Sequence, residues 1–259
     1  MRTLTRITYN TLQSILILTI CAIAFSFKSN AQEVKMGLAL TPNVSWMTAI
    51  DSVHSTQGVG GNFGFEFILD FMLSEKIAFS TGVHVFDTKG TINYLDPVVQ
   101  TYLEDDYVNS VSRNYDLKYV EIPLTLKART KQIGYTTIYG QVGLGLGLNI
   151  GVEASDQRKK EYVLEESVWE EYDDEYLLPS SPAIQNDIKL LRSSLIVGLG
   201  AEQSLSELYS LIIGASYNSG FINIHKGTNQ IQFDDMGTPA EIELAGNDGF
   251  VEVVIGLIF

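Results

Sequence analysis

Cysteine is almost absent from this chain, whose 259 residues include only Cys21. That residue lies in the first 31 positions, which we expect to be removed, so the mature chain would have neither a disulfide framework nor a cysteine metal site. Basic residues are also scarce, with 17 Lys and Arg against 31 Asp and Glu and a formal charge of -14. So acidic a chain excludes nucleic acid as a partner, and we expect no cofactor.

Long apolar runs are missing after Ala31, where no stretch reaches the about 20 residues of a transmembrane helix. Any membrane span of the mature chain must therefore be built from β-strands. The first 31 residues have the layout of a secretory signal peptide, with Arg2 and Arg6 before an apolar centre at 15–27 and the small Ser29 and Ala31 at the cleavage positions.

We therefore expect a signal peptide over 1–31 and a barrel domain over 32–259. Three positive charges, on Arg2, Arg6 and Lys28, leave with the signal peptide and move the formal charge from -14 to -17. An uncleaved membrane anchor is the alternative, but the apolar centre is short for a span of about 20 residues.

The last eleven residues show most clearly what the sequence does contain. Every second residue back from the C-terminus is apolar: Phe259, Leu257, Ile255, Val253 and Val251. The interleaved residues are mixed and include Glu252. This period-two alternation predicts a strand, and a strand that is apolar on one face and ends on an aromatic residue suits the closing strand of a membrane barrel. Phe259 is then the expected terminal insertion signal, read by the barrel-assembly machinery.

Seven further stretches alternate in the same way. The expected strands cover 34–46, 59–73, 77–88, 115–129, 138–150, 191–205, 209–222 and 249–259. Their connections alternate between short turns (74–76, 130–134, 206–208) and long loops (47–58, 89–114, 152–190, 223–248). An even number of strands with this alternation predicts an all-β fold, an eight-stranded antiparallel up-and-down transmembrane β-barrel with short periplasmic turns and long extracellular loops.

A soluble β-sandwich would alternate too, but its outward face would carry more Lys, Glu and Thr. Here the second face is rich in glycine: Gly143, Gly145, Gly147, Gly198, Gly200, Gly214 and Gly256. Glycine weakens an exposed strand, but it suits the crowded lumen of a small barrel. Outward aromatic residues also fit two interfacial belts, with Phe71, Tyr209 and Phe259 near the periplasmic rim. Trp46, Phe63 and Tyr217 fall near the opposite rim.

One string in the fourth expected strand resembles a known family. Tyr119-Val120-Glu121-Ile122-Pro123-Leu124, followed by Leu126-Lys127, is similar to a segment of the PorT-like outer-membrane β-barrel family of the Bacteroidetes. The resemblance implies a barrel in the outer membrane and leaves open any role in secretion or gliding. Pro123 has no amide hydrogen for the ladder, so we expect a local break in strand pairing there.

Charged and polar residues fall on the inward face of the expected barrel. They are Lys35, Glu66, Asp70, His84, Glu121, Lys127, Arg129, Gln141, Glu202 and Glu252. Charges held away from water must pair or be hydrated, and eight strands enclose a space that side chains can fill. We interpret these residues as a lumen polar network, a plug centred on Glu121 with Lys127 or Arg129. A proton or ion path, which would make the protein a narrow channel, is the alternative.

The loop after the fifth expected strand is strongly acidic, with eight Asp and Glu among aromatic residues over 161–175. Aromatic residues are common interface anchors, and the candidates for contact with a surface or secretion partner are Trp169, Tyr172, Asp173, Asp174 and Tyr176. A solvated loop and divalent-cation binding are the alternatives, although the spacing of a calcium loop is absent.

Catalysis would need a constellation that the sequence offers only weakly. His54 lies among Asp51, Ser52 and Ser55, where a lipid-modifying enzyme could place its nucleophile and base, but polar loops commonly contain such residues and no G-x-S-x-G string is present. We expect no enzyme and no metal site, and a structural or surface-interaction role. The alternatives are a narrow channel, a lipid-modifying enzyme and a soluble periplasmic ligand-binding barrel.

Overall fold

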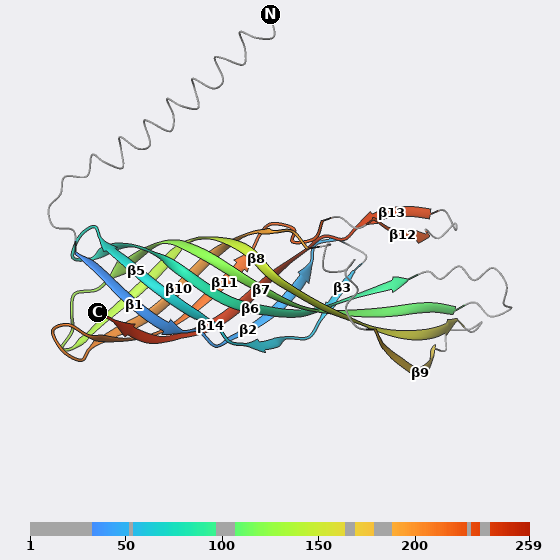
Figure 1. Cartoon of the computed structure of the whole chain (residues 1–259), viewed down its shortest axis with the longest axis horizontal. Coiled ribbons are helices and arrows are strands. Elements are labelled where there is room, and N and C mark those ends of the chain that lie inside the picture. Colours follow the sequence, from blue (N-terminus) through green and yellow to red (C-terminus); the bar gives the residue numbers. More distant parts are fainter. Residues whose placement is uncertain are drawn as a thin grey trace, which may run out of the picture. The chain divides into compact units, whose positions relative to one another are not determined.

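The computed structural model describes residues 33–51, 54–96, 107–163, 169–178, 188–226, 229–233 and 239–259. The expected signal peptide lies outside these residues. The elements in these ranges are strands (Figure 1): β1 Val34–Leu40, β2 Asn43–Ala49, β3 Ser55–Gln57, β4 Gly60–Asn62, β5 Phe65–Met72, β6 Ile77–Asp96, β7 Tyr107–Arg129, β8 Thr136–Val163, β9 Trp169–Leu178, β10 Leu191–Ser204, β11 Ser210–Gly220, β12 Asn229–Phe233, β13 Pro239–Glu243 and β14 Gly246–Ile258. Within the same ranges, no helix is long and apolar enough to cross a membrane.

Eight antiparallel strands close into a ring in the order β1-β5-β6-β7-β8-β10-β11-β14, with β14 pairing back to β1. The closing pair is completed by Met36 and Phe259, whose backbones exchange hydrogen bonds of 2.9 and 2.7 Å. Strands β2 and β4 pair with each other beyond β1 and β5, and β2 also pairs with β14. The predicted eight-stranded up-and-down barrel is therefore confirmed.

The short turns, over 73–76, 130–135 and 205–209, lie at the same end of the barrel as Val34 and Phe259, while β9, β12 and β13 lie at the other end (Figure 1). The predicted loops 89–114 and 152–190 are wrong in part, because β6, β7 and β8 extend to 20, 23 and 28 residues. β9 lies in the second of these loops, and the hairpin β12–β13 lies in the predicted loop 223–248. The backbone pairing continues beyond the point where the outward side chains stop being apolar. Hydrophobic alternation therefore predicts strands that end earlier than they do in the structure.

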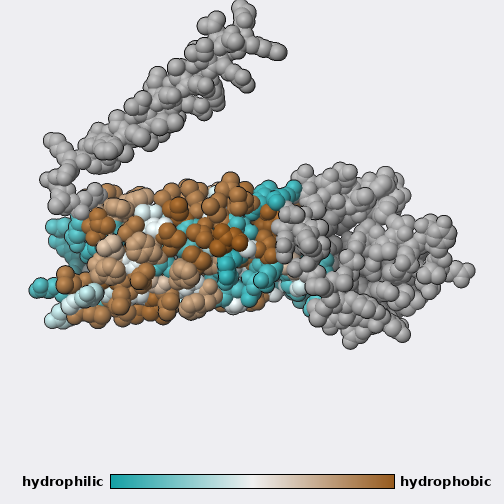
Figure 2. Space-filling model, in the orientation of Figure 1, coloured by the Kyte–Doolittle hydropathy of each residue, from teal (hydrophilic) through white to brown (hydrophobic). Residues whose placement is uncertain are grey.

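The apolar side chains of the alternating stretches point outward. Phe65, Leu146, Ile255 and Leu257 are 45–57% exposed, and apolar residues cover much of the face of the barrel seen in Figure 2. An exposed apolar surface of this extent marks contact with lipid rather than water. Trp46 and Tyr217 stack with ring centroids 6.3 Å apart towards the long-loop end, and Phe71 and Phe79 lie 6.5 Å apart near the short turns.

Pro123 produces the expected interruption on one side of its strand. The pairing of β6 with β7 runs from Ile77↔Ala128 to Thr81↔Leu124 and resumes at His84↔Glu121. Pairing with β8 continues through Pro123↔Gly145. The register is the same on both sides of the gap, so the missing proline donor opens the ladder locally without a bulge.

Candidate functional site

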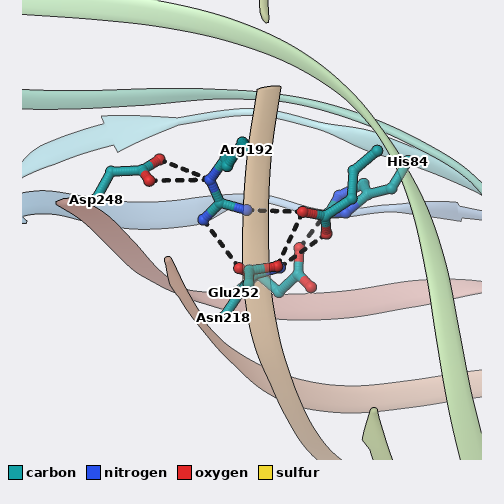
Figure 3. A network of polar contacts seen from close by, with 7 residues as sticks. His84, Arg192, Asn218, Asp248 and Glu252 are labelled. Carbon is teal, nitrogen blue, oxygen red and sulfur yellow. Dashed lines mark hydrogen bonds and ion pairs between the residues drawn. The ribbon is translucent and has the colours of Figure 1, made fainter. Parts of the chain in front are cut away.

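Arg192 lies at the centre of a polar network inside the barrel. Its Nε donates to both carboxylate oxygens of Asp248 at 2.9 and 3.0 Å, and its Nη2 donates to Asn218 Oδ1 at 2.9 Å (Figure 3). Its Nη1 donates to Glu121 Oε2 at 2.7 Å. Arg192 is only 2% exposed, and Asp248 and Glu121 are fully buried. The guanidinium therefore joins β10 to β7, β11 and β14 across the lumen.

Glu121 is held by further donors in the same network. Ser194 Oγ donates to its Oε2 at 3.0 Å, and Asn218 Nδ2 donates to its Oε1 at 2.9 Å. Gly145 on β8 makes room for this carboxylate, because a Cβ at that position would overlap both the Glu121 side chain and Ser194 Oγ. The glycine on the inward face thus admits a large charged side chain from the neighbouring strand.

The half of the lumen nearer the short turns contains two further ion pairs. Lys127 Nζ donates to Asp70 Oδ2 at 2.6 Å, and both side chains are 1% exposed. Arg129 forms an ion pair with Glu202. Lys35 is half-buried on β1, opposite Asp70 in the register. Charge-assisted bonds of this kind join β5 to β7 and β7 to β10.

Between these groups lies a cluster around His84. His84 Nε2 lies 3.0 Å from Thr41 Oγ1 and 3.3 Å from Glu252 Oε2, and Glu66 faces His84 in the register. Glu66, Gln141 and Glu252 line a cavity of only ≈ 10 Å³. That is about the volume needed for one water molecule.

Towards the long loops, the interior becomes apolar. Phe86 packs between Phe250 and Tyr119, with ring centroids 4.7 and 5.7 Å away. The Arg192 guanidinium lies 5.3–5.7 Å from the centroids of these three rings, within the range of cation–π attraction. The same buried cluster also contains Met47, Ile92, Tyr115, Leu117, Ala154, Ile188, Ile224 and Leu244.

Two connections next to this apolar cluster make polar contacts at the long-loop end. Asp51 Oδ1 accepts from the His54 amide at 2.7 Å, and Asp51 Oδ2 accepts from the Ala245 amide at 3.2 Å. Asn223 Oδ1 accepts from the His225 amide at 2.9 Å. The His225 side chain is fully buried, and burial lowers its pKa from 6.5 to about 4. We call Asp51, His54, Asn223 and His225 the roof.

The structure pairs the predicted lumen residues differently from our expectation. Glu121 bonds Arg192 rather than Lys127 or Arg129, which bond Asp70 and Glu202 instead. Sequence reasoning overlooked Arg192 and placed Asp248 in a loop. The alternation pattern could have identified Arg192 as a lumen residue, because it is an even number of residues from the inward Ile196 and Glu202 and so lies on the same face of its strand.

The candidate contact residues Trp169, Tyr172, Asp173, Asp174 and Tyr176 lie on β9, which pairs with β8. Their side chains lie outside the described part of the structure. Among the catalytic candidates, His54 Nδ1 lies 2.7 Å from Asp51 Oδ1, Ser55 is exposed on β3, and Ser52 lies outside the described residues. In the ranges that the structure describes, no three His, Cys, Asp or Glu residues are grouped as metal ligands.

Comparison with known proteins identifies the family of the chain and several structures with a similar fold. A search of curated protein sequences found no match. Among solved structures, the chain is similar to Neisserial surface protein A of Neisseria (11% identity over 87% of this chain and 95% of that one, TM-score 0.42). It is also similar to OprG of Pseudomonas aeruginosa (12%, 87% and 93%, TM-score 0.41) and to the attachment invasion locus protein Ail of Yersinia pestis (13%, 88% and 99%, TM-score 0.35).

The family model described as outer membrane protein beta-barrel domain matches residues 30–226, well over half of the chain. The match includes seven strands of the ring, from β1 to β11. The chain therefore belongs to the outer membrane protein β-barrel domain family.

Proposed function

We propose that this protein is a plugged outer-membrane barrel with a structural or surface-contact role rather than a transport role. The observation that supports the proposal is the bonding and packing of the described lumen residues. Ion pairs lie in the half near the short turns, the Arg192 network follows, and the apolar cluster lies in the other half together with the Arg113–Asp156 pair. In the proposal, these side chains together leave no continuous path for ions. Their charges serve to bond strands across the barrel.

The orientation of the proposed protein follows from export through a cleaved signal peptide. Both termini of the barrel would then face the periplasm, and the long strands β6, β7 and β8, with β9 paired to β8, would extend from the cell surface. We further propose that the chain is a PorT-like member of this family, on the resemblance of residues 119–124. Phe259, bonded to Met36 at the closing seam, is positioned to act as the insertion signal for barrel assembly.

We propose the acidic strand β9 as the contact surface. Its ten residues include Trp169 and five acids with no Lys or Arg, and it prolongs the sheet beyond the barrel through its pairing with β8. A partner with a basic surface would be attracted over distances up to about 8–10 Å at physiological ionic strength.

Lipid-bilayer conductance tests the plugged lumen. We expect purified wild-type protein to show no steady openings. F86A/F250A removes two rings from the apolar cluster and should give more leak events, whereas V251A, a change to an exposed outward side chain, should stay silent. Steady openings of the wild type would refute the plug and favour the narrow channel.

Capture from the cell surface tests the contact role. A variant with Asp173 and Asp174 changed to Asn and Trp169 changed to Ala should lose a partner that wild type retains, and D116N provides a control in another acidic position. The enzyme alternative makes a separate prediction. Wild type would modify lipid or lipopolysaccharide, and H54A would abolish the modification; an inert wild type removes that alternative.

A further inference from the structure

A pocket of ≈ 660 Å³ lies outside the lumen, against the outward face of β6, β7 and β8. Its wall on one side is the segment Gly58-Val59-Gly60, between β3 and β4. Glycine is required at both ends of this segment. Gly58 has φ +80°, and a Cβ at Gly60 would overlap the Lys89 side chain. The segment is therefore built to lie close over β6.

The pocket lies just beyond the lipid-facing surface. The last outward apolar residues beneath it on these strands are Val85, Val120 and Ile150, and the first outward charged residues beyond them are Asp87, Lys118 and Glu153. Lys89 is four residues past Val85, or roughly 10 Å higher at about 3.3 Å per residue and a strand tilt near 40°. Its backbone bonds Ser45 Oγ at 2.6 Å, next in the chain to Trp46, a residue type that is enriched at the membrane–water interface. The pocket therefore lies at the level expected for lipid headgroups.

The lining groups suit a sugar better than an anion. Lys89 Nζ is already paired with Asp116 at 3.0 Å, and Glu153 makes the lining net negative. Thr91, Asn114 and Ser155 add hydroxyl and amide groups. Thr91 Oγ1 donates to Asn114 Oδ1, which fixes the orientation of the amide. Alternating donors and acceptors match the hydroxyl groups of a saccharide, which are themselves both donors and acceptors.

We infer that this pocket binds the saccharide headgroup of an outer-leaflet glycolipid. The apolar wall below it on the same strands, including Val83, Ile122 and Leu124, is exposed and would contact the acyl chains of the same molecule. Polar pocket and apolar wall together favour an amphiphile over a free sugar, and the net negative lining with its hydroxyl and amide groups favours a sugar headgroup over a phosphate.

Native mass spectrometry of the purified full-length protein in detergent tests the inference with three probes. These are a diglycosyl diacylglycerol, whose headgroup is uncharged, the free disaccharide of the same headgroup, and phosphatidylethanolamine. We expect the glycolipid to bind at least about tenfold more tightly than the other two. N114A/E153A should weaken it by about tenfold or more, since two hydrogen-bonding groups are lost. T48A/N247A changes two polar residues near the same boundary on β2 and β14, outside the pocket, and should bind like wild type.

Folding of each variant is checked by the mobility of the unheated protein in gel electrophoresis, and K89M provides a second, independent disruption of the pocket. Equal binding of the glycolipid and phosphatidylethanolamine would overturn the inference. So would binding of the free disaccharide as tight as that of the glycolipid, or unchanged binding by both N114A/E153A and K89M.

Discussion

Replacing Arg192 by Met should be the most damaging single change in the lumen. Methionine approximates the length of the arginine stem but carries no charge, so Asp248 and Glu121 would stay buried without their cation. Removing one partner of a buried ion pair costs about 3–5 kcal/mol. Because Arg192 serves two carboxylates and Asn218, we expect the upper part of this range. The loss of cation–π contact with three rings acts in the same direction.

The assay is urea unfolding of protein refolded into short-chain lipid vesicles, followed by tryptophan fluorescence. R192M should lower the free energy of unfolding by about 3–5 kcal/mol. K118M removes an exposed cation paired with Asp87 at 3.5 Å and should cost at most about 1 kcal/mol. The triple variant R192M/E121Q/D248N should recover much of the loss, because it removes the unpaired charges.

Two results would refute this reasoning. A loss below about 1 kcal/mol for R192M would mean that water or a rearranged partner replaces the guanidinium. A triple variant no more stable than R192M would mean that the cost comes from packing rather than from stranded charge. The comparison separates these effects because R192M and the triple variant share the substitution at position 192 and differ only in the two carboxylates.

Further predictions concern the roof, the inward glycines and the closing seam. The pKa of His225 is about 4 in the folded protein and 6.5 in the unfolded chain, so the unfolded chain binds more protons between these pH values. The contribution of His225 to stability should be full above pH 6.5 and fall by about 3 kcal/mol towards pH 4. H225Q should flatten this pH dependence when unfolding is measured at several pH values. G145A should cost about 1–3 kcal/mol through overpacking, whereas G61A, with nothing within 4 Å of its Cβ, should stay within about 0.5 kcal/mol in the same assay. Deleting Phe259 removes its two hydrogen bonds to Met36 and should lower the folded fraction recovered from membranes; full recovery would exclude an insertion role.

The ring of strands could be predicted from the sequence because contact with lipid requires an apolar residue at every second position of a strand. Leu257, Ile255 and Val253 alternate without exception, and the structure exposes all three. The position of Pro123 was equally informative, because a missing amide hydrogen has a local and calculable effect. These features depend on neighbours in the chain or in the ladder, and a single sequence displays them.

The partners inside the lumen could not be predicted in the same way. Alternation states that Glu121 and Lys127 point inward, but the choice of partner depends on barrel tilt and on which strand lies across the lumen. Glu121 meets Arg192, 71 positions away in the chain. The extension of β6–β8 was also missed, since their outer parts carry polar outward residues and no longer show the lipid pattern.

Strand β7 explains both outcomes, because its two faces exchange character along its length. Near the short turns its outward residues are Leu126, Leu124 and Ile122, and its inward residues include Lys127 and Glu121. Beyond this stretch the order reverses, with Lys118 and Asp116 outward and Tyr119, Leu117 and Tyr115 inward.

The pairing with β8 shifts register between Lys118 and Tyr119, where the polarity of the outward and inward faces changes over. Where lipid surrounds the barrel, burial of the outer face stabilises the ring, and the lumen can hold charges that bond one another. Where water surrounds it, the outer face must be polar, so the inner face has to supply an apolar core as in a soluble protein. The described lumen therefore changes from mainly salt-bridged to mainly apolar side chains at the height where the surroundings change from lipid to water, with the buried Arg113–Asp156 pair as an exception beyond it.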